Sequence, residues 1–92
     1  MVLAMALRRP DINRVSVVPI YEQLEASLAH QIEQGTLEPG EKLPGDRDLA
    51  IELGIGYQTV RRVMLSLAER GLVDRRQGKG TFVRGSGHVS GT

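Results

Sequence analysis

Apolar side chains recur every four residues in the stretch from residue 19 to residue 34, at Ile20, Leu24, Leu28 and Ile32. Positions four apart lie on the same face of a helix, so this spacing predicts a helix with one apolar stripe. Pro19 suits the first turn of such a helix, and Gly35 suits its end. The loop that follows contains one apolar residue, Leu37, which we expect to fill the core.

Two shorter apolar patterns follow. Residues 45–53 form a predicted helix with Gly45 at its start, and its inward residues are Leu49, Ala50 and Leu53. Residues 57–70 form another, in which Val60, Val63, Met64 and Leu67 fall within about 60° of one another on a helical projection. Gln58 and Arg62 lie nearly opposite this face, with Thr59 and Arg61 on its flanks. Two helices joined by a short turn, the second with a basic outer face, indicate a helix-turn-helix.

After residue 71 the apolar residues no longer follow a helical spacing. Leu72-Val73 and Thr81-Phe82-Val83 flank the polar segment 74–80, which predicts an antiparallel hairpin. Lys42-Leu43 is a further candidate for a very short strand. Gly78 and Gly80 leave the hairpin tip without side chains. Two interpretations stay open: the backbone approaches phosphate or a groove closely, or the glycines serve only the turn.

The two ends of the chain show no sustained period. Residues 1–18 are predicted to form a flexible arm and residues 85–92 a disordered tail or linker, which leaves residues 19–84 as one domain. The basic residues of the arm suit either a DNA groove or a solvated tail, and the tail is the favoured interpretation. The apolar N-terminus has neither the basic lead nor the length of a signal peptide or a membrane span, so no membrane partner is expected.

The net charge of +1 is unevenly distributed along the chain. Residues 1–21 carry +2, residues 22–56 carry −6 and residues 57–84 carry +5. An acidic first half and a basic second half indicate that only one side of the domain would attract a polyanion.

Enzymatic and metal chemistry find little support. The chain contains no cysteine and only two histidines, His30 on the outer face of its helix and His88 in the tail. No nucleophile–base pair or phosphate-binding loop after a strand is evident, so we expect neither an enzyme nor a metal or other cofactor. A core this small also leaves no room for a small-molecule effector within these residues. The lack of cysteine fits a cytoplasmic protein.

Five segments in this order and spacing resemble the N-terminal DNA-binding domain of the GntR (gluconate-repressor) family of bacterial regulators. They are PIYEQL at 19–24, I-x-x-G-x-L-x-P-G-x-K-L-P at 32–44, DRDLAIELG at 46–54, TVRR at 59–62 and RGLVDRRQGKGTFV at 70–83. The resemblance implies a mainly α fold with a small β-hairpin, the winged helix-turn-helix: three helices plus the hairpin as wing. It also implies that helix 57–70 enters the major groove and that wing residues 77–80 meet the minor groove.

The expected DNA contacts combine this resemblance with the residues of this chain. The resemblance implies contacts from Arg47, Thr59, Arg61 and Gly78, the last with its neighbours Gln77, Lys79 and Gly80. Arg62 stands where many members carry Glu and should add affinity. The family often has Ser or Thr followed by Arg where this chain has Gly56-Tyr57, so Tyr57 or Gln58 is expected to take over base contact, with adenine suited to Gln58. Gly45 likewise replaces a capping Ser.

The sequence therefore predicts a sequence-specific DNA-binding transcription regulator, with a repressor expected. A palindromic double-stranded operator would bring two copies together on DNA, without requiring a dimer in solution. The chain stops at Thr92, before the effector domain that family members usually carry, and either a free-standing regulator or a fragment fits. The alternative function is a winged-helix module that docks protein. An outward Leu65 and the acidic first helices favour this alternative, and the arginines at 61, 62, 75 and 76 oppose it.

Overall fold

The computed structural model describes residues 12–84 and places three helices where the apolar periodicity predicted them. These helices are α1 (Ile20–Glu33), α2 (Asp46–Leu53) and α3 (Tyr57–Glu69). Gly45 and Gly56, both in extended conformation, are the N-caps of α2 and α3. The third helix ends one residue earlier than predicted because Arg70 is its C-cap.

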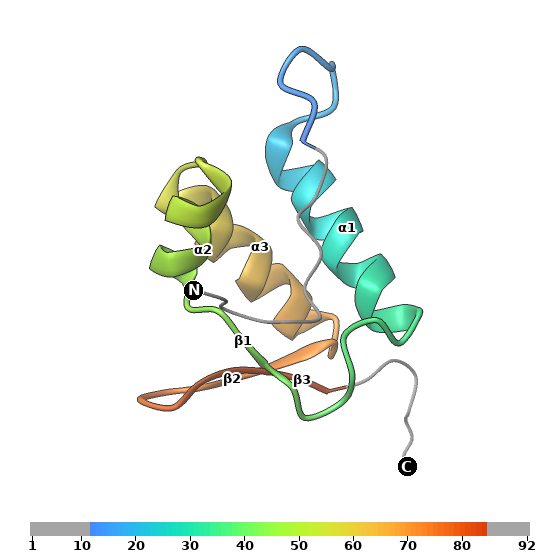
Figure 1. Ribbon diagram of the computed structural model, residues 1–92, viewed down its shortest axis with the longest axis vertical. Coiled ribbons are helices and arrows are strands. Elements are labelled where there is room, and N and C mark those ends of the chain that lie inside the picture. Colours follow the sequence, from blue (N-terminus) through green and yellow to red (C-terminus); the bar gives the residue numbers. More distant parts are fainter. Residues whose placement is uncertain (1–11, 85–92) are drawn as a thin grey trace.

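The core lies between the three helices and one face of a small sheet. In Figure 1, α3 lies between α1 and α2, and the sheet lies below all three. The predicted inward residues of α3 are buried, and so are those of α1 from Leu24 onward. Leu37 is fully buried although it belongs to a loop, as expected. Aliphatic packing therefore fixes how the helices sit against one another.

The sheet contains one strand more than a simple hairpin. Its strands are β1 (Lys42–Leu43), β2 (Val73–Arg76) and β3 (Gly80–Val83), all antiparallel in the order β1-β3-β2. Strand β2 continues to Arg76, so the tip is shorter than the predicted segment 74–80. We call the β2–β3 hairpin the wing and residues 77–79 its tip. Figure 1 shows the wing extending away from the helices toward the side on which α2 lies.

Residues 12–18, the described part of the predicted arm, contact the domain. Ile12 packs against the core, and the Gln23 amide donates a hydrogen bond to the backbone oxygen of Asn13 at 2.9 Å. Arg14 donates to the carbonyl oxygens of Leu53 and Gly54, at 3.4 and 3.1 Å, where α2 ends. Residues 1–11 and the predicted tail 85–92 lie outside the described residues, and the flexibility of both ends stays a prediction. Within residues 12–84 the helices are too short or too polar to cross a bilayer.

Candidate nucleic-acid interface

The turn between α2 and α3 sets the start of the predicted recognition helix. Gly54 closes α2 with a φ of +67°, in the left-handed region that glycine adopts readily. The amide of Ile55 then donates to the carbonyl of Ala50 at 3.1 Å, and α3 begins two residues later. The short turn places the start of α3 directly after the end of α2 and fixes how the two helices cross.

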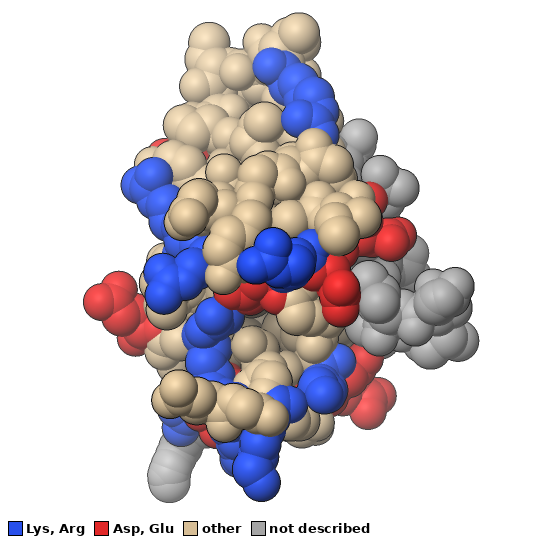
Figure 2. All heavy atoms as spheres, turned by 90° about the vertical axis from the view of Figure 1, so that its left-hand side faces the viewer, with Lys and Arg blue, Asp and Glu red and all other residues tan. Residues whose placement is uncertain are grey.

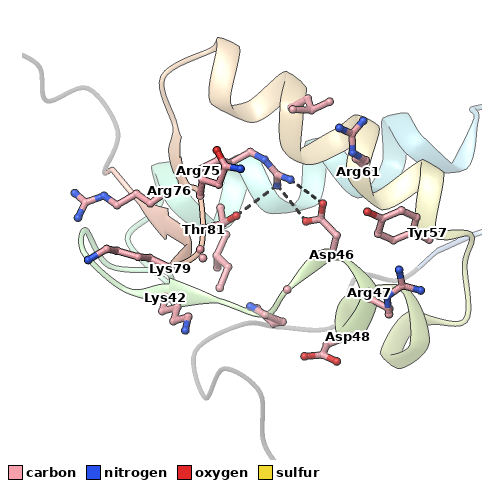
Figure 3. A pocket seen from close by; sticks show the side chains of 17 residues that line it. Lys42, Asp46, Arg47, Asp48, Tyr57, Arg61, Arg75, Arg76, Lys79 and Thr81 are labelled. Atoms are coloured by element: carbon pink, nitrogen blue, oxygen red, sulfur yellow. Dashed lines mark hydrogen bonds and ion pairs between the residues drawn. The ribbon is translucent and has the colours of Figure 1, made fainter.

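Arg47 and Tyr57 meet across these helix starts. The Arg47 guanidinium carbon lies 4.9 Å from the centre of the Tyr57 ring, which is a cation–π distance. Both side chains are exposed, and Figure 3 shows them on the same side of the site. The Tyr57 ring thus orients a basic side chain at the position where the sequence departs from its family pattern.

A hollow separates the wing from α2 and α3. Its lining combines residues from β1, α2, α3 and the wing, and basic side chains come from each of them: Lys42, Arg47, Arg61, Arg75, Arg76 and Lys79. Figure 2 views the molecule from this side and shows Lys and Arg side chains around the hollow, with Asp and Glu among them. The site is therefore an open, polar and mainly cationic surface.

The side chain of Lys42 in β1 packs closely against Gly80 at the start of β3. A Cβ built on Gly80 would lie 2.7 Å from Cε of Lys42, and the φ of Gly80 is +125°. The side chain of Lys42 thus crosses the space that any larger residue at position 80 would occupy. The φ of Gly80 gives it a structural requirement for glycine that is independent of any ligand, and the contact with the flexible end of Lys42 adds to it.

Arg75 and Asp46 join the wing to the start of α2. The two terminal nitrogens of Arg75 donate to both carboxylate oxygens of Asp46, at 3.1 and 2.8 Å (Figure 3). The same guanidinium also donates to Oγ1 of Thr81 at 3.4 Å. The hydrogen bond to Asp46 raises the pKa of Arg75 above its ordinary value, although partial burial lowers it. Arg75 is therefore a charged group already committed to an internal partner.

Other arginines of the basic half also have internal partners. Arg76 donates to Asp74 at 2.9 Å and lies over the ring of Phe82. Arg70 donates to Glu25 of α1 at 2.9 Å. Charge in the sequence thus overstates the charge that the surface offers to a ligand.

The structure brings most of the ten predicted site residues together. Those that line the hollow are Arg47, Tyr57, Arg61, Gln77, Gly78, Lys79 and Gly80. Gln58 and Arg62 line a smaller hollow on the outer face of α3, which shares Arg61 with the first. Thr59 is half-buried and lines neither of the two. The guanidinium carbon of Arg62 lies 3.7 Å from the centre of the Tyr21 ring on α1, so Arg62 reaches toward α1 rather than the wing.

Sequence reasoning missed several residues of this surface. Lys42 enters through strand β1, which was predicted as a strand but not paired with the wing. Asp46 was not singled out, and Arg75 and Arg76 were treated as equivalent charges. Their alternation along β2 is the one local signal that separates them, because successive side chains of a strand point to opposite faces.

Leu65 is 44% exposed, as its predicted outward position requires, and it lines both hollows.

The fold and this surface together define the class of protein: a winged helix-turn-helix domain, with three helices and a wing beside the exposed start of the third helix. The family model described as "Bacterial regulatory proteins, gntR family" matches residues 20–83. The chain belongs to the GntR family.

Individual relatives agree with this assignment. The transcriptional repressor NagR of Bacillus subtilis (strain 168) is 42% identical over 73 residues, covering 79% of this chain and 30% of NagR. YtrA from Sulfolobus acidocaldarius, a GntR-family transcription factor, has a TM-score of 0.77 at 32% identity, covering 86% of this chain and 83% of that one. The AraR DNA-binding domain in complex with operator ORE1 has a TM-score of 0.68 at 30% identity, covering 84% of this chain and 94% of that one. The chain spans about 30% of the length of the curated relatives it matches.

Proposed function

We propose that this chain is the sequence-specific DNA-binding domain of a transcription regulator that acts as a repressor. The observation that carries the proposal is the hollow that basic residues from β1, α2, α3 and the wing line together. A surface of this kind suits a phosphate backbone, whereas the polar side chains at the start of α3 suit base edges. Family membership and the resemblance to the operator-bound AraR domain support the same conclusion.

In the proposed complex, α3 lies in the major groove and the tip of the wing meets the minor groove. Tyr57, Gln58 and Arg61 are the base-reading candidates, because residues near the start of a recognition helix reach base edges. Arg47, stacked on Tyr57, and Lys79 at the tip contact phosphates. Gly78 lets the backbone of the tip approach the groove, since nothing lies within 4 Å of the place where its Cβ would stand.

We further propose that two copies bind a palindromic operator, because dimeric readers of this class match the two-fold symmetry of their sites. Selecting bound duplexes from a random pool gives the half-site and its spacing together. A single half-site, with no symmetric partner at a fixed distance, would contradict this part of the proposal.

The main test is titration of labelled duplex with wild-type protein and single variants at two salt concentrations. Arg61→Ala should cost about 1–3 kcal/mol on the selected duplex and relax specificity at one base position. Lys79→Ala should weaken binding to all sequences more evenly. Arg84→Ala is the matched control, because Arg84 is also exposed but does not line either hollow. Equal effects of Arg61→Ala and Arg84→Ala would show that α3 does not read the duplex.

A module that docks protein is the second candidate, and the half-exposed Leu65 in the hollow is the observation that favours it. The same titration separates the two functions. A wild-type protein that binds no duplex even at low salt, where phosphate contacts are strongest, would support the docking module.

A further inference from the structure

Arg75 and Asp46 form the best-shielded ion pair in the described part of the chain. Their side chains are 27% and 12% exposed, and each of the two terminal guanidinium nitrogens donates to one carboxylate oxygen. Paired contacts of this kind fix orientation as well as distance, because a planar fork fits a carboxylate in one way. The pair connects residues 29 positions apart in the sequence.

The ion pair connects an edge strand of the sheet to α2, so it helps to hold the wing against the helices. Strand β3 lies in the middle of the sheet and is held by β1 on one side, where Leu43 faces Thr81. Strand β2 is an edge strand, and beyond Val73 it contributes no further buried side chain. Arg75 is thus the residue that ties the outer half of β2 to α2, one residue before the exposed Arg76 and the tip.

We infer that Asp46 and Arg75 are positioning residues that set the wing at a fixed angle to the recognition helix, and that DNA binding requires this setting. The inference rests on the proposed function and adds to it a role for two residues that do not themselves touch DNA. A fixed wing lowers the ordering cost of binding, because the tip does not have to be immobilised when the duplex arrives. Thr81 supports the same guanidinium from β3.

Simple electrostatics and the positioning role predict opposite effects of Asp46→Asn on DNA affinity. Asp46 is an acidic group in the lining of a mainly cationic hollow. If its charge acts only on the DNA, Asp46→Asn removes a repulsion and strengthens binding. If it holds Arg75, Asp46→Asn removes the two-point contact, lets the β2–β3 hairpin shift relative to α2 while its strands stay paired, and weakens binding.

Asp48 provides the matched control. It lies in the same first turn of α2, lines the same hollow, and is exposed, with no ion pair among residues 12–84. Asp46→Asn should weaken binding to the selected duplex about tenfold, the size of one lost side-chain contact. Asp48→Asn should tighten binding, because it removes an acidic group from the same hollow without breaking an ion pair. Binding by Asp46→Asn as tight as wild type, or tighter, overturns the inference.

A double-mutant cycle tests the wing directly, at a temperature where circular dichroism shows each variant folded. In the Asp46→Asn background, Lys79→Ala should have a much smaller effect than in the wild type, because the tip is already shifted from its position on the duplex. Arg61→Ala should keep its full effect there, since α3 still meets the duplex. An undiminished effect of Lys79→Ala in this background overturns the inference.

Arg75→Lys is the second variant. Because it keeps the positive charge, any loss of DNA affinity cannot come from loss of charge. Lysine keeps the positive charge but cannot make the two-point contact. Weaker binding by Arg75→Lys, with a diminished effect of Lys79→Ala, supports positioning, whereas unchanged binding identifies Arg75 as a simple cation and overturns the inference. Wild-type protein that binds no duplex would refute the proposed function itself. Wild-type binding with unaffected Asp46→Asn and Arg75→Lys variants would refute only the inference.

Discussion

Gly80 offers the sharpest test of the wing geometry, because two independent features of the structure disfavour a side chain there. Its φ of +125° is far from the left-handed well near +57° that other residues occupy at modest cost. A Cβ would also lie 2.7 Å from Cε of Lys42. Gly78 at the tip is the natural comparison, with a φ of +78° and nothing within 4 Å of the place of its Cβ.

The expected magnitudes follow from these geometries. Backbone strain at Gly80→Ala should cost about 1–3 kcal/mol of unfolding free energy. Displacing the flexible end of Lys42 into a poorer rotamer should add about 0.5–1 kcal/mol. Gly78→Ala should cost about 1–2 kcal/mol, from its backbone alone. One kcal/mol lowers Tm by roughly 4–8 °C in a domain of this size, so the difference between the variants is measurable.

Thermal and urea unfolding of the two single variants supplies the assay. Gly80→Ala should be the less stable of the two, and its cost should fall by the rotamer contribution when Lys42→Ala is also present. The backbone contribution should remain in that double variant. Equal stabilities of Gly78→Ala and Gly80→Ala would refute the close approach of Lys42 and the special φ together.

Three further predictions concern residues that hold the helices in place. Leu37→Ala should cost about 2–5 kcal/mol by urea unfolding, because its side chain is fully buried, and a cost within error of zero would exclude it from the core. Arg14→Ala should lower stability by about 0.5–1 kcal/mol through loss of its contacts to the end of α2, whereas Val15→Ala next to it should be neutral in the same thermal scans. Glu25→Gln should cost about 1 kcal/mol by losing its ion pair between α1 and α3, and an equal effect of the exposed Glu33→Gln would contradict that role.

The helices could be predicted because burial follows a local period. Leu24, Leu28 and Ile32 are buried at the spacing that the sequence displays. The pairing of β1 could not be predicted in this way, because a strand of two residues carries no period. Its partner β3 lies about forty residues later, and only the folded chain brings the two together.

In the site, too, the residues positioned by neighbouring sequence could be predicted, whereas contacts between distant residues could not. The cluster of Arg47, Tyr57 and Arg61 could be placed, because a short turn between two helices fixes their spacing. The partner of Arg75 could not, since nothing near either residue marks an ion pair across 29 positions. Arg62 was placed correctly on the outer face of α3, but a single helix cannot reveal that Tyr21 of α1 lies beneath its guanidinium.

Ion pairing within the domain also determines how steeply DNA binding should depend on salt. Six cationic side chains line the hollow, and two of them, Arg75 and Arg76, are paired with carboxylates. The remaining four, Lys42, Arg47, Arg61 and Lys79, have no carboxylate partner among the described residues.

Each phosphate contact contributes about −0.9 to the slope of log K against log salt, so phosphate contacts by Lys42, Arg47 and Lys79, with Arg61 on a base, predict a slope of about −2.7 per bound copy. Five contacts, with Arg75 and Arg76 added, would give about −4.5 on the same basis. Titrations at several salt concentrations distinguish these values, and the steeper one would mean that Arg75 and Arg76 exchange their internal partners for phosphate when DNA binds. The shallower slope would mean that the domain binds with its internal ion pairs intact, because paired arginines release no counterions.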